Sequence, residues 1–225
     1  MTLLRLLAFA FLVLSTAQAN PSTHDLAFDV YLAREEVVYF RQQSVTYSGA
    51  LVTFQGRFDT TVPALADTII SKLQGLNVDI QEITAIQNLF NSGFQTVTDA
   101  VKNIESTLQN TTVTSGGVLT SLDTSDWVAL REQNSALTLE LNYIDNQFQS
   151  AKAQWIVVEV DQESNLYLAL QGQDAGTVAN VMVDWEDIKS FFKSDGIVLE
   201  NENQIFTVRG GKTLDSLRIV LEQVL

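Results

Sequence analysis

The segment IFTVRGGKTLDSLRIVLEQVL, residues 205–225, has the outline of a phosphate-binding loop. A β-like run meets two glycines, a lysine and a threonine, and a helix-like run follows. The phosphate-binding motif, however, requires G-x-x-x-x-G-K-[ST], with its first glycine five residues before Gly211. Phe206 occupies that position, so the backbone N–H groups cannot form the loop that cradles phosphates. We therefore predict that Gly210 and Gly211 form a turn between a strand and a final helix.

Three carboxylates stand close together in the segment DWEDIKSFFK: Asp184, Glu186 and Asp187. Paired carboxylates are the catalytic groups of most glycoside hydrolases, so this group is the densest candidate for acid–base chemistry. The segment also has helical character, and acidic residues in the first turn of a helix interact favourably with its dipole. Because no neighbouring sequence supplies a sugar cleft, we interpret the three residues as structural.

The chain contains one histidine, His24, and no cysteine. A single imidazole near the N-terminus excludes the usual Ser-His-Asp triad and any site with several histidine ligands. The absence of cysteine excludes thiolate chemistry. The segment DQESN, residues 161–165, looks like the start of a calcium loop, but Leu166 replaces the glycine required at the sixth position and Gly172 the glutamate at the twelfth. We therefore expect no enzymatic activity and neither a metal nor a cofactor.

The first residues, MTLLRLLAFAFLVLSTAQAN, have the three parts of a secretory signal. Arg5 supplies the positive start, residues 6–14 the apolar run, and residues 17–19 the small-x-small cleavage site. An apolar run of about ten residues is too short to cross a bilayer of roughly 30 Å as a helix. We predict cleavage between Ala19 and Asn20 and a secreted, extracellular mature chain, and no later segment is apolar enough to span a membrane.

Charge and a glycosylation sequon indicate how the surface behaves. The chain has 27 acidic and 13 basic residues and a net charge of −14. Because phosphate recognition depends on Lys and Arg, this charge argues against nucleic acid or an anionic membrane as a partner. The sequence NTT at Asn110 is an N-glycosylation sequon in a segment with loop character. In a secreted eukaryotic protein we expect Asn110 to be glycosylated.

Apolar residues recur alternately every three and four positions over most of residues 26–155. Such seams, sustained far beyond three heptads, indicate long helices that pack side by side. One polar residue interrupts each of three runs: Ser44, Gln87 and Asn134. The runs are Leu26–Phe58, Val62–Leu108 and Trp127–Trp155.

Turn-forming residues divide these seams. Residues 59–62, followed by Pro63, predict a turn and a helix start, and residues 110–126, with two glycines, predict a loop. Gly75 favours a break that leaves helices of about thirty residues each. Short turns favour an antiparallel bundle within one chain. The alternative is an intermolecular coiled coil that builds an oligomer.

After Trp155 the spacing changes to one typical of strands. Residues 155–160 and 166–171 flank a polar segment and predict a hairpin, and residues 197–209 repeat the pattern. Each hairpin precedes a short helix. We therefore predict an α+β, mainly α protein: a long antiparallel, coiled-coil-like helical bundle followed by a small antiparallel sheet with two short helices. The predicted domains are a signal peptide (1–19), a long-helix bundle (20–153) and a small α+β subdomain (154–225).

These features predict a secreted, non-enzymatic protein that acts through its surface, by protein–protein interaction or in a structural extracellular role. Its partner is then another protein, or a further copy of the chain held through the helices. The alternative is a carrier with an apolar small molecule inside the bundle, because bundle cores sometimes contain ligand sites. A more distant alternative is a carboxylate-based hydrolase that uses Asp184, Glu186 and Asp187.

Overall fold

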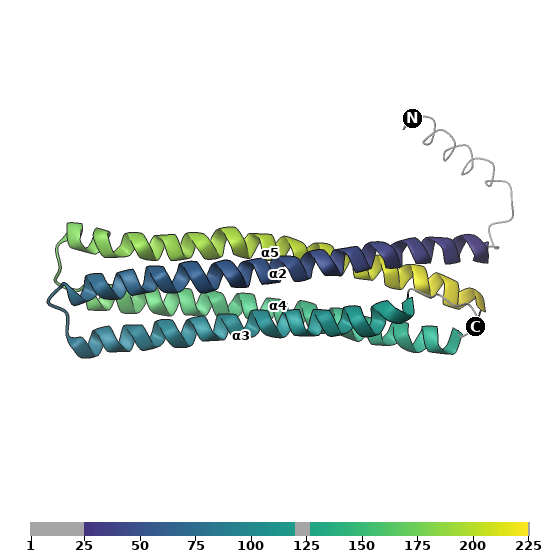
Figure 1. Cartoon of the computed structure of the whole chain (residues 1–225), viewed down its shortest axis with the longest axis horizontal. Coiled ribbons are helices and arrows are strands. Elements are labelled where there is room, and N and C mark those ends of the chain that lie inside the picture. Colours follow the sequence, from purple (N-terminus) through teal and green to yellow (C-terminus); the bar gives the residue numbers. More distant parts are fainter. Residues whose placement is uncertain (1–24, 120–126, 225) are drawn as a thin grey trace, which may run out of the picture.

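A computed structural model describes the backbone of residues 25–119 and 127–224, and the side chains of these residues except 110–119, 127, 129, 130 and 133. The described chain forms four long helices, which run alternately up and down in one elongated bundle (Figure 1). Each helix lies beside the next, and α5 lies beside α2, which closes the bundle. The helices are α2 (Leu26–Gln74), α3 (Ile80–Leu119), α4 (Trp127–Ala169) and α5 (Ala175–Val224).

Aspartates and a glycine mark the helix ends. Asp25, Asp79 and Asp174 precede α2, α3 and α5, and each carboxylate accepts a hydrogen bond from the backbone N–H two positions later. Such caps satisfy donors that the first turn of a helix leaves unpaired. The hydrogen bonds that Thr177 donates hold the pKa of Asp174 below its usual value. Gly172, after α4, has φ 85°, the left-handed conformation in which many helices end.

The apolar seams that the sequence predicts form the core of the bundle. In α2, every position of the first run from the second onward is buried, including Ser44. The Ser44 hydroxyl donates a hydrogen bond to the carbonyl of Phe40 at 3.0 Å, so its burial leaves no unpaired donor. Gln87, the polar residue of the second run, is exposed, and Ile86 beside it takes the core position. Asn134 is half-buried, and its side-chain oxygen has no hydrogen-bond partner among the described residues.

The turn predicted at residues 59–62 is wrong, because α2 continues through it with Pro63 inside the helix. Phe58, Val62 and Ala66 are all buried there. A spacing of four repeated in this way is a stutter, which rotates the buried face slightly around the helix without ending it. The two predicted seams on either side therefore belong to one helix of 49 residues, about 73 Å long.

The break favoured at Gly75 is confirmed. α2 ends at Gln74, and α3 begins at Ile80. The loop predicted from residue 110 is wrong over its first ten residues, since α3 extends to Leu119. The rest of that loop, residues 120–126, lies outside the described residues.

The small antiparallel sheet predicted after residue 154 is wrong. The described part of this region is helical apart from the short connection near residues 170–174, and the described residues contain no strand. α4 passes through residues 153 and 154 and includes the first predicted strand, while the residues of the second hairpin lie within α5. The fold is therefore a four-helix bundle in its described part rather than an α+β structure.

The cause of this error is visible in α4 itself. Trp155 is buried, but the β-branched residues Ile156, Val157 and Val160 are 54%, 58% and 56% exposed. Apolar residues on the outer face of the helix hide the helical period and leave a run that is typical of a strand.

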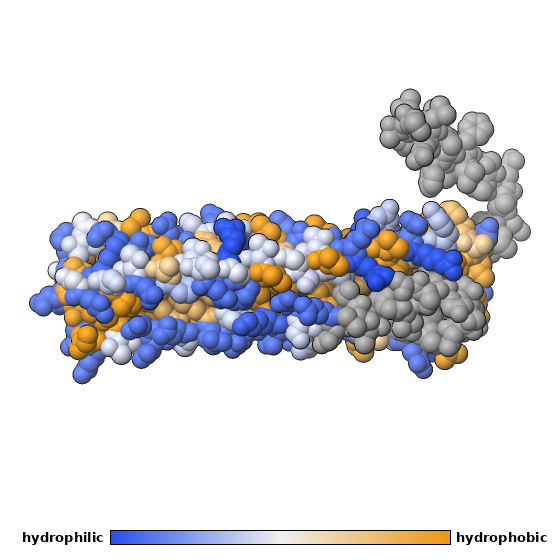
Figure 2. Space-filling model, in the orientation of Figure 1, coloured by the Kyte–Doolittle hydropathy of each residue, from blue (hydrophilic) through white to orange (hydrophobic). Residues whose placement is uncertain are grey.

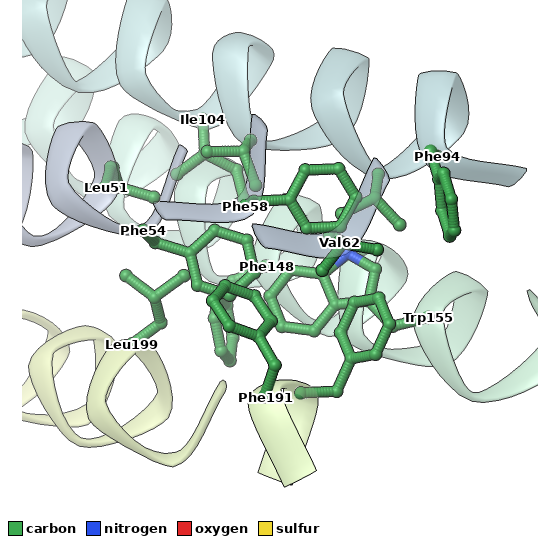
Figure 3. Packing of buried hydrophobic residues seen from close by; sticks show 14 of the residues in the cluster. Leu51, Phe54, Phe58, Val62, Phe94, Ile104, Phe148, Trp155, Phe191 and Leu199 are labelled. Atoms are coloured by element: carbon green, nitrogen blue, oxygen red, sulfur yellow. The ribbon is translucent and has the colours of Figure 1, made fainter. Parts of the chain in front are cut away.

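Aromatic side chains fill the middle of the bundle. Phe54 from α2 stacks on Trp155 from α4 with ring centres 5.3 Å apart, and Phe191 from α5 lies 5.5 Å from Phe54. Phe148 meets Trp155 edge to face at 6.1 Å. Figure 3 shows these rings from three helices directed toward one another. The interior at this level is occupied by protein side chains.

The surface mixes polar and apolar side chains. On the face shown in Figure 2, apolar residues are interspersed with hydrophilic ones along the whole bundle. Among the described residues, no helix is both long and apolar enough to cross a membrane.

Candidate functional site

The three carboxylates that form the catalytic alternative do not converge on one site. All three lie on α5. Asp184 pairs with Lys72 of α2, whereas Glu186 pairs with Lys189, one turn further along α5, at 2.7 Å. Asp187 is exposed. Because the two paired groups face different neighbouring helices, they cannot act as an acid–base pair on one substrate in this conformation.

The double glycine of the phosphate-loop outline lies in the middle of α5, so the turn predicted there is wrong. Gly210 is buried where α5 meets Leu141 of α4, and a Cβ at this position would lie 2.4 Å from a Leu141 methyl carbon. Gly211 has open space around it. The Thr213 hydroxyl lies 3.0 Å from the carbonyl of Arg209 on α5 and 3.2 Å from that of Glu36 on α2, so it contacts both helices. The residues that resemble a phosphate-binding loop therefore pack α5 against its neighbouring helices.

The remaining sequence-based sites fall outside the described structure. Ala19, Asn20 and His24 precede the first described residue. Asn110 belongs to the backbone of α3, but its side chain is not among those described. In the described residues, no group of three or more His, Cys, Asp or Glu side chains could hold a metal ion.

A groove of about 480 Å³ lies between α4 and α5. Its floor includes Trp155 and Phe192, which are 5% and 7% exposed. A Cβ at Gly196 would lie 3.7 Å from the ring of Trp155, so this ring lies close to the α5 backbone. Ile156 and Ile197 line its walls and are about half exposed. Its size is within the range of small-molecule sites.

Ion pairs cross this groove at two levels. Lys152 of α4 contacts Glu200 of α5 at 2.6 Å. Lys189 of α5 contacts Glu163 of α4 at 3.1 Å, in addition to its bond with Glu186. Hydrogen bonds from Lys189 to these glutamates, that to Glu186 foremost, raise the pKa of the lysine. The charged groups are thus paired with one another, which is typical of ion pairs that hold two helices together.

Glu159 lies between the two levels and is half-buried. Burial raises the pKa of its carboxyl group; Lys189 opposes this shift, and Glu163 and Glu186 add to it. A raised pKa is a feature of general acids, but buried ion-pair networks produce it as well. The geometry favours an ion-pair network as the cause of the raised pKa, since Glu159 faces the ion pairs that join α4 to α5.

Replacing Glu159 with glutamine tests this assignment. A carboxyl group whose pKa is raised on folding destabilises the native state above that pKa and stops doing so as the pH falls below its unfolded value. We therefore expect Glu159→Gln to raise the melting temperature by about 1–2 °C at pH 7 and to have no effect below pH 4. Thermal unfolding followed by circular dichroism at both pH values measures this. A lower melting temperature at pH 7 would show that the carboxylate is a stabilising partner instead.

The outer face of α4 carries a second row of heptad-spaced residues, here called the outer seam. It alternates steps of three and four, and all ten positions are exposed and uncharged. Its large members are Leu139, Tyr143, Val157, Val160 and Tyr167, which are 50–71% exposed. The outer seam consists of Ala136, Leu139, Tyr143, Asn146, Ser150, Ala153, Val157, Val160, Ser164 and Tyr167.

The outer seam is the site that sequence reasoning missed. Its spacing is present in the sequence, but the inner seam of the same helix, which includes Leu141, Phe148 and Trp155, has the same period. After the apolar residues of the inner seam are assigned to the core, the remaining apolar residues resemble interruptions of the helix or short strands. A helix with apolar residues on two faces can pack inward and still bind a further helix.

No family model, curated protein or solved structure matches the chain.

Proposed function

We propose that this chain is an exported, non-enzymatic protein that works by holding another polypeptide against the outer seam of α4. One observation carries the proposal: a helix already buried on its inner face presents ten consecutive heptad positions without a charge on its outer face. Protein surfaces carry a charged residue at about three positions in ten. A continuous uncharged row on so acidic a chain is the pattern of a contact face.

The exposed side chains support the same conclusion. Leu139 and Val157 are 71% and 58% exposed, and scattered residues of this kind are ordinary on a surface. Here they recur at the spacing that knobs-into-holes packing requires, over about 47 Å of helix. Contiguous apolar surface of this kind marks interaction sites. A helix from a partner fits this row better than a small molecule does.

The interior of the bundle favours a surface role over that of a carrier. A carrier would hold its ligand between the helices, but rings from α2, α3 and α5 occupy that space around Phe58, which contacts Phe54, Phe94, Phe191 and Phe192. The outer seam, in contrast, has no described side chain over it.

The proposal is tested by placing a photo-crosslinking phenylalanine derivative at Tyr167 of the full chain. After irradiation in the extracellular material of its source cells, we expect a covalent adduct with a polypeptide. The matched control carries the same group at Lys102, an exposed position on α3, and should give no adduct. We expect the chain recovered from this material to begin at Asn20. Equal adducts at both positions, none at either, or retention inside the cell would overturn the proposal.

A further inference from the structure

We propose that the outer seam of α4 binds the outer seam of a second copy of this chain, with the two helices antiparallel and a two-fold axis between Ser150 and Ala153. This inference rests on the proposed function, in which the outer seam is a contact face. It adds the identity of the partner, the direction of its helix and the register of the contact.

The spacing of the outer seam is symmetric about its centre. Its steps along the chain are three, four, three, four, three, four, three, four and three, which read the same in both directions. A two-fold axis therefore places every seam residue opposite another seam residue, as an isologous interface requires. The resulting pairs are Ala136 with Tyr167, Leu139 with Ser164, Tyr143 with Val160, Asn146 with Val157, and Ser150 with Ala153.

Two of these five pairs join a large side chain to a small one. Tyr167, the bulky residue at one end, meets Ala136, and Leu139 meets Ser164. The central pair, Ser150 and Ala153, consists of two small residues, so the helix backbones can approach each other closely at the axis. Alternation of large and small side chains across facing positions allows two helices to interdigitate.

The distribution of charge points to the same face. Each copy carries a net charge of −14, so two copies repel each other unless they meet where charges are absent. None of the ten seam residues is charged. At the flanks, Gln147 faces Gln154 of the second copy, and Asp161 faces Glu140, a like-charge contact that salt screens. The nearby Lys152 and Glu163 are turned toward α5, where they pair with Glu200 and Lys189.

A comparable row on α2 does not have these properties. Tyr31, Val38 and Val52 are also exposed at heptad spacing. The same row, which runs from Tyr31 to Gly56 in alternate steps of four and three, however, contains Glu35. A two-fold axis at its centre would place this carboxylate opposite Val52. Burial of a carboxylate against an apolar side chain is unfavourable. The absence of a charged residue from the row distinguishes α4.

The first test measures the mass of the full chain in solution by light scattering after size exclusion. We expect twice the mass of one chain, with dissociation on dilution. Val157→Glu should weaken the dimer at least tenfold, while Val183→Glu, an exposed position on α5 at 51%, should leave it unchanged. Circular dichroism should show both variants folded, because both side chains are exposed in the monomer. A monomer at every concentration, or equal loss in both variants, would overturn the proposal.

The second test determines direction and register. The chain has no cysteine, so chains carrying only Ser150→Cys or only Ala153→Cys each contain a single thiol. Mixed and oxidised, the two should form the heterodimeric disulfide in excess over either homodimer, since facing positions bring Cβ atoms within bonding range. An excess of both homodimers indicates a parallel pair and overturns the proposed geometry. If the chain is a monomer and the group at Tyr167 still crosslinks to a different protein, only the proposal of a second copy is refuted. If that crosslink is also lost, the proposed function is refuted as well.

Discussion

Replacing Phe58 with alanine is expected to lower the free energy of unfolding by about 3–5 kcal/mol, as large-to-small substitutions of buried aromatic residues do. Phe58 is 1% exposed. Its ring meets Phe94 edge to face at 5.8 Å and lies 6.1 Å and 5.9 Å from Phe191 and Phe192. The substitution therefore removes contacts with two other helices and leaves a cavity that the surrounding rings fill only in part.

Urea unfolding followed by circular dichroism measures this loss. Tyr31→Ala on the same helix is the matched control, because Tyr31 is 57% exposed, and surface substitutions usually change stability by less than about 0.5 kcal/mol. An equal loss in both variants would show that Phe58 is not part of a packed core.

The same variant separates the surface role from that of a carrier. A cavity lined by apolar side chains stays dry and binds small apolar molecules such as benzene. We expect benzene to raise the melting temperature of Phe58→Ala, because a ligand that binds only the native state stabilises it. The unsubstituted chain should show no such rise. A large rise in the unsubstituted chain would favour the carrier.

The N-terminal half of the fold could be predicted from the sequence because a nearly uninterrupted apolar seam marks the buried face of each helix there. The seam through Val37, Tyr47 and Leu51 is buried from Val30 onward, and α2 ends next to Gly75, which keeps a right-handed helical backbone (φ −76°, ψ −9°). Pro63 was misleading because a proline within a helix usually ends or kinks it. Here the buried residues on both sides of it keep the helix continuous.

The C-terminal half could not be predicted because polar residues are buried and apolar residues exposed. Asn203 is 3% exposed, and it joins three helices by accepting from Tyr47 at 3.1 Å and donating to Asp145 at 2.7 Å. Burial, with a smaller contribution from Asp145, raises the pKa of Tyr47. On the outside, Val208 is 54% exposed. A method that places apolar residues inside and polar residues outside fails for such a helix, since the network that satisfies Asn203 comes from distant positions in the sequence.

The two parts of the candidate site, the outer seam and the groove, also differ in whether the sequence could predict them. The outer seam is a local pattern, so a second count along α4, starting at Ala136, would have found it. The groove between α4 and α5 lies instead where Gly196 meets Trp155, and this meeting depends on how the two helices align. No property of the single sequence indicates that alignment.

Alanine substitutions at the adjacent glycines Gly210 and Gly211 distinguish the turn predicted from the sequence from the helix that the structure shows. Alanine is more favourable than glycine in a helix interior by about 1 kcal/mol. Gly211→Ala should therefore raise the free energy of unfolding by about 0.5–1 kcal/mol, because no atom lies within 4 Å of the added Cβ. Gly210→Ala gains the same propensity, but its Cβ meets the side chain of Leu141 at 2.4 Å and 2.5 Å. Overpacking of this kind costs about 1–3 kcal/mol.

The difference between the two variants isolates the packing of α5 on α4, since the gain in helix propensity cancels. We expect Gly210→Ala to be less stable than Gly211→Ala by about 1–3 kcal/mol, measured by urea unfolding. Equal gains in both would mean that Leu141 does not press on α5. Losses in both would favour the turn, because a turn with positive φ disfavours alanine at either position. Only a gain at Gly211 without a matching gain at Gly210 agrees with a continuous helix whose one glycine lies against its neighbour.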